Sequence, residues 1–203
     1  ARTRLLIAPK AQRFLGMGRR LDKGVERKSQ RTRLIEARAA LVDREGLEAA
    51  LRRRVTDWLH RADVHALGFY FPIRGEPDLR QVIAQWLAHD KRRVAGLPVV
   101  VGKTLEFHAW TVDAPMRAGH SGIPVPAQGR AVQPECLLIP CLGFDDKRFR
   151  LGYGGGYYDR TLAALVPFPL AVGIAFEATR LASIDPQPHD LRMDVVITDA
   201  AVY

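Results

Sequence analysis

The chain has 203 residues, 47% of them hydrophobic, so it can form one domain with a full core and without disulfide or metal support. No run approaches the roughly eighteen apolar residues of a membrane span, and Cys136 and Cys141 fit neither a disulfide scaffold nor a zinc finger. The net charge of +9 belongs to residues 1–61, with 17 Lys/Arg against 7 Asp/Glu, whereas residues 62–203 are nearly neutral. We therefore expect a cytoplasmic protein, and charge alone does not separate nucleic-acid binding from small-anion binding.

The first 25 residues carry seven basic side chains and one acidic side chain, and Pro9, Gly16 and Gly18 interrupt any helical or strand period. We interpret residues 1–25 as an appendage outside the fold and place the domain at residues 26–203. The composition is rich in arginine and poor in acids, like that of a transit peptide, but it contains no serine. A targeting segment and a start upstream of the domain both stay open as explanations.

Helices are predicted next, followed by short strands. Apolar residues recur at helical spacing over residues 26–41 and 44–61. The arginines at 52–54 are typical of a solvated helix face. Residues 65–71 form an apolar, aromatic run that predicts a buried strand, and Asp78 is placed to cap a helix that ends near residue 89.

The remaining elements predict the fold class. The apolar runs at 93–101 and 105–110 have the patterns of strands, and the Gly/Pro-rich stretch 114–134 is typical of a functional loop. Short apolar strands that alternate with amphipathic helices indicate a single three-layer α/β domain, with a largely parallel sheet flanked by helices. The further elements predicted are strands at 136–140, 170–176 and 194–198 and a helix over 155–165.

The glycine-rich segment FDDKRFRLGYGGGYYDR, at residues 144–160, is the strongest chemical signal. Glycines at 152 and 154–156 lie between a predicted strand and a predicted helix, where bare backbone can approach an anion closely. A tight turn packed on tyrosines is the structural alternative. The nearby Arg150 and Asp159 favour a phosphate-binding loop.

Two common nucleotide motifs do not match this loop. A Walker loop requires GxxxxGK[ST], and no Lys-Ser or Lys-Thr pair follows these glycines. The dinucleotide fingerprint GxGxxG fits Gly152 and Gly154, but Tyr157 occupies the place of the third glycine. We therefore predict a phosphate-binding loop of another kind and disfavour a dinucleotide-dependent oxidoreductase.

The loop sequence RLGYGGGYYDR, with PCLGFD at residues 140–145, resembles the signature of the 5-formyltetrahydrofolate cyclo-ligase family. The resemblance extends over residues 27–199, with the family's motifs in order. Its opening K-x-x-L-R pattern corresponds to residues 27–31, with arginine at the lysine position and glutamine at the leucine position. Glu76 in YFPIRGEPD, Trp110 in FHAW and HDLRMD at 189–194 match the family's later motifs.

The resemblance implies conversion of 5-formyltetrahydrofolate to 5,10-methenyltetrahydrofolate with ATP and Mg²⁺. The γ-phosphoryl group would move to the formyl oxygen, which makes that oxygen a good leaving group before N10 closes the ring. The implied catalytic residue is Arg150, and the implied magnesium ligands are Asp159 and Asp190. The implied ATP-binding residues are Arg27, Lys28, Ser29, Gln30, Arg31, Arg150, Leu151, Gly152, Tyr153, Gly154, Gly155, Gly156, Tyr157 and Tyr158.

The implied substrate-binding residues are Phe71, Glu76, Trp110, Tyr153, Gly154, Gly155, Gly156 and Tyr157. A carboxylate at Glu76 suits the amidine-like edge of a pterin, and we expect Trp110 to offer an exposed face for stacking. His189 is interpreted as an ordinary hydrogen-bond partner rather than a catalytic base.

The expected partners are ATP and 5-formyltetrahydrofolate, with no membrane and no nucleic acid, and the expected state is a monomer. One alternative comes from another class of protein. It is a cyclo-ligase-like protein that has lost activity and binds RNA through its basic N-terminal residues. The altered K-x-x-L-R pattern keeps this alternative open.

Overall fold

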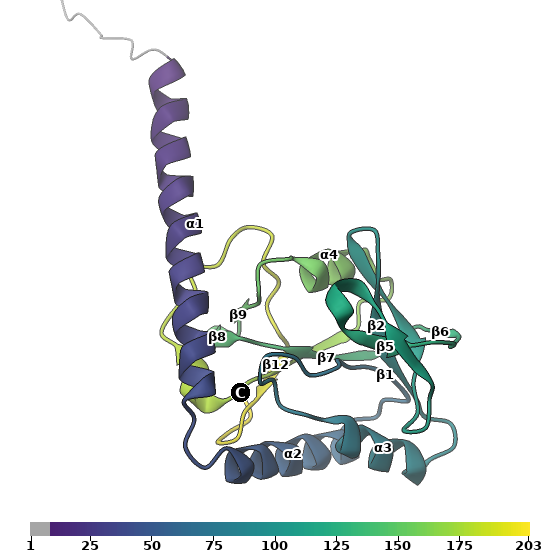
Figure 1. Cartoon of the computed structure of the whole chain (residues 1–203). Coiled ribbons are helices and arrows are strands. Elements are labelled where there is room, and N and C mark those ends of the chain that lie inside the picture. Colours follow the sequence, from purple (N-terminus) through teal and green to yellow (C-terminus); the bar gives the residue numbers. More distant parts are fainter. Residues whose placement is uncertain (1–8) are drawn as a thin grey trace, which may run out of the picture.

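A seven-stranded sheet lies at the centre of the fold, in the order β12-β10-β7-β1-β2-β3-β6 (Figure 1). The computed structural model describes the backbone of residues 9–203 and the side chains of residues 24–203. Neighbouring strands from β12 to β2 run parallel, and β3 is antiparallel to both β2 and β6. The strands are β1 (Ala66–Gly68), β2 (Val94–Val101), β3 (Thr104–Ala109), β6 (Ala131–Val132), β7 (Cys136–Pro140), β10 (Leu170–Ile174) and β12 (Val195–Ile197).

Helices cover both faces of this sheet, with α2 (Arg44–Arg61) and α3 (Arg80–His89) on one face and α4 (Tyr157–Ala164) on the other (Figure 1). Side chains of β7 alternate between two core clusters. Leu138 packs with α2 and α3, whereas Leu137 packs in the cluster that includes α4. A parallel sheet buried on both faces explains why its strands are continuous apolar runs. The predicted three-layer α/β fold is confirmed.

The first helix, α1 (Pro9–Ala39), begins earlier than the predicted residue 26. The expectation that Gly16 and Gly18 interrupt a helical period is wrong, because a glycine costs a helix only about 1 kcal/mol and does not break it. Pro9 is tolerated at the first position, where its missing N–H has no partner to lose. The division of the chain at residue 25 stays a prediction.

The inward stripe of α1 follows a regular spacing. Gly24, Arg27 and Arg31 line a cavity, Leu34 packs in a small core with Leu142 and Leu151, and Arg38 is fully buried. Successive steps of three and four residues place these side chains on one helix face. This face of α1 therefore carries three arginines into the interior.

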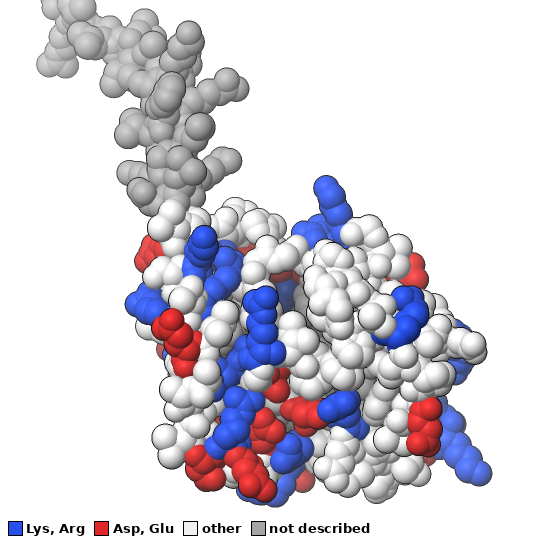
Figure 2. Space-filling view, in the orientation of Figure 1, with Lys and Arg blue, Asp and Glu red and all other residues white. Residues whose placement is uncertain are grey.

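Figure 2 shows most lysine and arginine side chains of this view over the half that carries α1 and α2.

The prediction that Asp78 caps α3 is wrong by one residue, because the helix begins at Arg80 and its N-cap residue is Leu79, which makes no side-chain capping hydrogen bond. The Asp78 Oδ1 atom accepts a hydrogen bond from the backbone N–H of Arg80 at 3.0 Å. Sequence periodicity misses several short elements, because strands of two or three residues have no period to detect. They are β4 (Met116–Ala118), η1 (His120–Gly122), β5 (Pro124–Pro126), β8 (Gly143–Asp145), β9 (Arg150–Leu151), η2 (Glu177–Thr179) and β11 (Arg180–Leu181).

The order in which strands are added to the sheet reverses between the parallel neighbours β1 and β7. From β1 the chain passes through α3 to β2 on one side, and from β7 it passes through α4 to β10 on the other. Ligands of open α/β sheets bind outside the carboxyl ends of the strands at such a reversal. The topology therefore places a binding crevice beyond the ends of β1 and β7. No helix in the described part of the chain is long and apolar enough to cross a membrane.

Candidate functional site

A cavity of about 610 Å³ lies at this reversal point. Tyr70 and Phe71 follow β1, and Pro140 ends β7, so the carboxyl ends of both strands form part of its wall. The glycine turn at residues 152–156 and the inward face of α1 form the polar side. An apolar side comes from Pro98, Val100, Leu105, Ile123 and Val125.

The glycine turn exposes bare backbone to this cavity. Gly154 and Gly156 have φ values of +98° and +65°, which side chains of L-residues rarely adopt. The Arg31 Nε atom donates to the Gly152 carbonyl at 2.9 Å, and a Cβ atom on Gly154 would lie 3.3 Å from the Arg31 guanidinium carbon. The turn thus needs glycine both for its backbone conformation and for the approach of Arg31.

Two ion pairs hold the aspartates of the cavity wall. The Arg27 Nη1 atom lies 2.8 Å from Asp190 Oδ2, and the Arg150 Nη2 atom lies 2.8 Å from Asp159 Oδ2. Backbone N–H groups hold the same two carboxylates. The Gln187 N–H donates to Asp190 at 2.7 Å, and the Leu191 N–H donates to Asp159 at 3.2 Å. Both carboxylates are thereby fixed on the wall of one cavity, each beside a guanidinium.

The two aspartates fit Mg²⁺ only in company with other oxygen donors. Among the residues with described side chains, no group of three His, Cys, Asp or Glu stands close enough to hold a metal ion. Mg²⁺ commonly takes one or two carboxylates and completes its octahedron with water and phosphate oxygens. Asp159 and Asp190 therefore suit a Mg²⁺ ion that arrives with a phosphate ligand.

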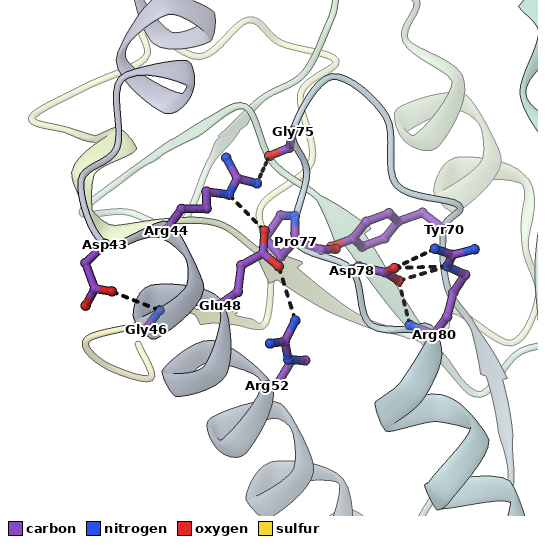
Figure 3. Close-up of polar contacts among 10 residues, drawn as sticks. All are labelled: Asp43, Arg44, Gly46, Glu48, Arg52, Tyr70, Gly75, Pro77, Asp78 and Arg80. Carbon is purple, nitrogen blue, oxygen red and sulfur yellow. Dashed lines mark hydrogen bonds and ion pairs between the residues drawn. The ribbon is translucent and has the colours of Figure 1, made fainter.

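A loop fixed at several points carries Glu76 into the other side of the cavity. Glu76 is buried, with 5% of its surface exposed, and its Oε2 atom accepts from the Ile73 N–H at 2.9 Å. Arg44 of α2 donates to the Gly75 carbonyl at 2.6 Å, and the Tyr70 hydroxyl donates to the Pro77 carbonyl at 2.8 Å (Figure 3). Both residues next to Glu76 are thus anchored, which sets the direction of its side chain.

Burial dominates the electrostatics of Glu76. It raises the pKa of this carboxyl to about 7, against the opposing effects of the Ile73 N–H, Arg38, Tyr153 and Arg74. Burial and the nearby Glu76 likewise raise the pKa of Tyr153 to about 12. Glu76 therefore changes its charge near neutral pH, whereas the Tyr153 hydroxyl keeps its proton.

The structure brings most of the predicted site residues to the cavity and leaves five away from its wall. Lys28, Ser29 and Gln30 are off the inward stripe of α1, with Lys28 and Ser29 exposed to solvent. Leu151 is fully buried in the core beside α1. Trp110 is only 6% exposed and packs edge-on against Phe69 at 5.1 Å between ring centroids, so the expectation of an exposed stacking face is wrong. The predicted residues on the cavity wall are Arg27, Arg31, Phe71, Glu76, Arg150, Gly152, Tyr153, Gly154, Gly155, Gly156, Tyr157, Tyr158, Asp159 and Asp190.

Sequence reasoning missed several polar residues of this wall, among them Arg74 and His120. Arg74 has a φ of +48°, and its guanidinium lies 5.3 Å from the centroid of the Tyr153 ring. His120 stacks edge-on against Tyr157 at 6.0 Å. Arg74 lies in the segment YFPIRGEPD, two residues before Glu76, which could have suggested it. His120 belongs to no motif, and only the placement of the Gly/Pro-rich loop beside the glycine turn could have suggested it. His189, with 73% of its side chain exposed, lies at the rim, 3.9 Å from Asp190.

A polar cavity at the reversal point of a mostly parallel sheet, with a glycine turn at a helix N-terminus, defines an α/β ligand-binding domain of the kind used by enzymes. A family model narrows this class. The model of the 5-formyltetrahydrofolate cyclo-ligase family matches residues 23–199, and the chain belongs to this family of ligases.

Two relatives match most of the chain, and both are named 5-formyltetrahydrofolate cyclo-ligase. The protein from Haemophilus influenzae is 25% identical over 177 residues, which cover 81% of this chain and 92% of the relative. The protein from Mycolicibacterium smegmatis is 26% identical over 202 residues, covering 84% and 93%. A third, from Mycoplasma pneumoniae, is 39% identical over 67 residues, a match that spans only 40% of that relative.

Two solved structures share the fold. A 5,10-methenyltetrahydrofolate synthetase from Aquifex aeolicus has a TM-score of 0.71 and 28% identity, and the match covers 87% of this chain and 91% of that one. A 5,10-methenyltetrahydrofolate synthetase from Mycoplasma pneumoniae has the same TM-score of 0.71 at 23% identity, covering 85% and 98%. The family signature in the glycine loop thus agrees with the fold of the whole domain.

Proposed function

We propose that the protein converts 5-formyltetrahydrofolate to 5,10-methenyltetrahydrofolate with ATP and Mg²⁺. The formyl oxygen would take the γ-phosphoryl group, N10 would attack the formyl carbon, and phosphate would leave as the ring closes. The single observation that carries this proposal is the meeting of three groups in one cavity. They are the glycine turn at 152–156, the aspartate–arginine pairs and the buried Glu76.

The glycine-turn side of the cavity suits the triphosphate. Backbone N–H groups beside the first turn of α4 favour an anion, and Arg27, Arg31 and Arg150 supply positive charge from two directions. Phosphoryl transfer asks a protein mainly for positioning and for stabilising charge on the transferred group. In this proposal Arg150 contacts that group, and Arg27 and Arg31 bind the remaining phosphates.

Asp159 and Asp190 are the residues that would hold Mg²⁺. When bound, the ion would neutralise phosphate charge and polarise the oxygens of the transferred group. Each aspartate pairs with an arginine in the structure, so binding of the nucleotide would exchange protein ion pairs for contacts to phosphate and metal. This exchange lets the same side chains stabilise both the empty and the loaded cavity.

The Glu76 side of the cavity suits the folate. A carboxylate accepts two hydrogen bonds from the N–C–NH₂ edge of a pterin, and Phe71 and Tyr153 offer aromatic rings on the same wall. Placing the pterin there directs the formyl group toward the phosphates. The RNA-binding alternative depends on the basic side chains of residues 1–23, which lie outside the described part of the chain. No observation on the described residues favours it.

The same proposal places the reaction in the reducing cytoplasm. Cys136 and Cys141 are free, buried thiols, and burial raises the pKa of each to about 12. Such thiols are inert and pack as small apolar side chains. No disulfide among the described residues supports the fold.

The test is an incubation of the purified chain with 5-formyltetrahydrofolate, MgATP and a matched ATP-free control. We expect the absorbance of the ring-closed product to appear with stoichiometric ADP, and neither product without ATP. A control in which Mg²⁺ is chelated should likewise form neither the ring-closed product nor ADP. ADP formation that does not depend on the folate, or product formed without ATP, would reject the proposal.

A further inference from the structure

Arg38, in the last turn of α1, is a buried cation without a charged partner. Its side chain is 1% exposed, and among the described residues no carboxylate lies within ion-pair distance. The Nε and Nη1 atoms are buried with no hydrogen-bond partner, and Nη2 donates to the Tyr153 hydroxyl. Burying a guanidinium in this way is costly unless nearby groups compensate the charge. The position therefore calls for a functional explanation.

Tyr153 connects Arg38 to Glu76. Because the Tyr153 oxygen accepts a hydrogen bond from Arg38, its own proton is free to point elsewhere. Tyr153 and Glu76 lie on the same cavity wall, and the effect of the Tyr153 hydroxyl on Glu76 is to lower the pKa of this carboxyl, as a donor to the ionised form does. The three groups form a chain in which a cation donates to a hydroxyl and the hydroxyl donates to a carboxylate. Hydrogen bonds in such a chain polarise and strengthen one another.

We propose that Arg38 is a positioning residue that acts on Glu76 through Tyr153. Arg38 favours the ionised form of Glu76 and directs its carboxylate into the cavity, where it can accept two hydrogen bonds from an amidine-like N–C–NH₂ edge. The identity of that ligand as a pterin rests on the proposed function, whereas the chain from Arg38 to Glu76 does not. Arg38 itself is absent from the cavity wall, so it acts without touching the ligand.

The other charged and titratable groups around Glu76 do not replace Arg38. Arg74, two residues away on the same loop, also lowers the pKa of Glu76, but its side chain is exposed and water screens its charge. Tyr70 and Tyr158 face the carboxylate from the ends of β1 and from α4, and burial raises the pKa of both hydroxyls well above 10. Arg38 is thus the buried positive charge that opposes protonation of Glu76.

The first measurement is the titration of the Glu76 carboxyl by carbon NMR, with its signal assigned through Glu76→Gln. The wild-type midpoint is expected near pH 7, and Arg38→Met is expected to move it upward by about one pH unit or more. Arg38→Lys, which keeps the charge, should bring the midpoint most of the way back to that of the wild type. Arg93→Met is the matched control, since Arg93 also has a buried, unpartnered Nε but lies just before β2, at the amino ends of the parallel strands and away from the cavity.

The second measurement separates this role from general support of the fold. For the wild type, KM for the folate should fall as the pH rises through about 7, because the carboxylate is the binding form. In Arg38→Met that fall should move to higher pH. A midpoint that moves from about pH 7 to about pH 8 should make KM for the folate about threefold higher at pH 7.5, and up to about tenfold higher below pH 6.5. KM for ATP should change little in the same variant.

Each result decides a different statement. An unchanged Glu76 midpoint in folded Arg38→Met overturns the proposal, as does an equal rise of both KM values. If Arg38→Met does not fold, two other variants carry the same test. Arg38→Gln removes the charge but keeps a polar group for the buried site, and Tyr153→Phe removes only the hydroxyl that joins the chain. A higher midpoint in a protein that binds no folate would leave the role of Arg38 intact and reject the proposed function.

Discussion

The two sides of the cavity are held by opposite means. On the side of the glycine turn, carboxylates and guanidiniums neutralise one another in pairs, and the turn itself is open backbone. On the side of Glu76, a carboxylate and an arginine are buried without forming an ion pair and communicate through a tyrosine. The first side can release its partners to an incoming phosphate, whereas the second keeps its charges ready before a ligand arrives. Flexible exchange and fixed preorganisation therefore coexist within one site.

The glycine turn should give the largest effect, because a side chain there opposes both backbone and ligand. Gly154→Val places a β-branched residue at a φ of +98° and pushes on Arg31, so we expect kcat/KM for ATP to fall by about 1000-fold. The control is Gly102→Val in the turn between β2 and β3, where φ is +59° and no atom lies within 4 Å of the added Cβ. Similar kinetics in the two variants would show that backbone strain alone explains the loss.

The burial of Glu76 should make the free energy of unfolding depend on pH. The pKa of Glu76 is about 7 in the folded protein against 4.5 for an unperturbed carboxyl, so the folded state holds the proton more tightly and wild-type stability falls as pH rises from 4.5 to 7. Glu76→Gln cannot titrate. We expect its unfolding free energy to rise relative to wild type by about 3 kcal/mol across this window and then to stay constant. Urea denaturation at several pH values measures this, and parallel curves would contradict it.

Removal of one member of the Arg150–Asp159 ion pair should lower the free energy of unfolding. Asp159→Asn leaves Arg150, with 5% of its side chain exposed, without its carboxylate, and we expect the unfolding free energy at pH 7 to drop by about 2 kcal/mol. The control Asp146→Asn breaks an exposed pair with Arg180 and should cost less than about 1 kcal/mol. Equal losses in the two variants would mean that the Arg150–Asp159 pair is no better buried than a surface pair.

The smallest effect is expected outside both sides of the cavity. Removal of residues 1–22 leaves Gly24, Arg27 and Arg31 in place, and the family match begins at residue 23. We expect unchanged kcat/KM for ATP and for the folate. A drop in either constant, measured with the intact chain as reference, would place part of that segment in the site.

The glycine turn is easier to recognise in the sequence than the surroundings of Glu76. Glycines, arginines and aspartates at short spacing identify an anion site locally, since backbone freedom and charge are properties of the residues themselves. Lys28, Ser29 and Gln30 were assigned to the site from a motif, but the spacing of the inward stripe of α1 places all three away from the cavity wall. Trp110 was expected to be exposed because a strand pattern does not tell which face the core covers. Monomeric state and the absence of nucleic-acid binding stay predictions.

Arg38 shows what local patterns miss. On the sequence it is one of several arginines in a basic helix, and nothing marks it as buried. Its environment is made by Tyr153, 115 residues away along the chain, and by Glu76 on a third segment. Contacts of this range come from the packing of α1 against the loops, which periodicity does not describe.

The single stripe of α1 has a further consequence. Arg27 and Arg31 face the glycine-turn side of the cavity, and Arg38, two turns further on, contacts Tyr153 on the Glu76 side. Because α1 is one continuous helix that contacts both sides of the cavity, a tilt of α1 caused at one side also moves the residues at the other. Occupancy by one co-substrate would then bias the affinity for its companion, and by linkage the bias would be mutual.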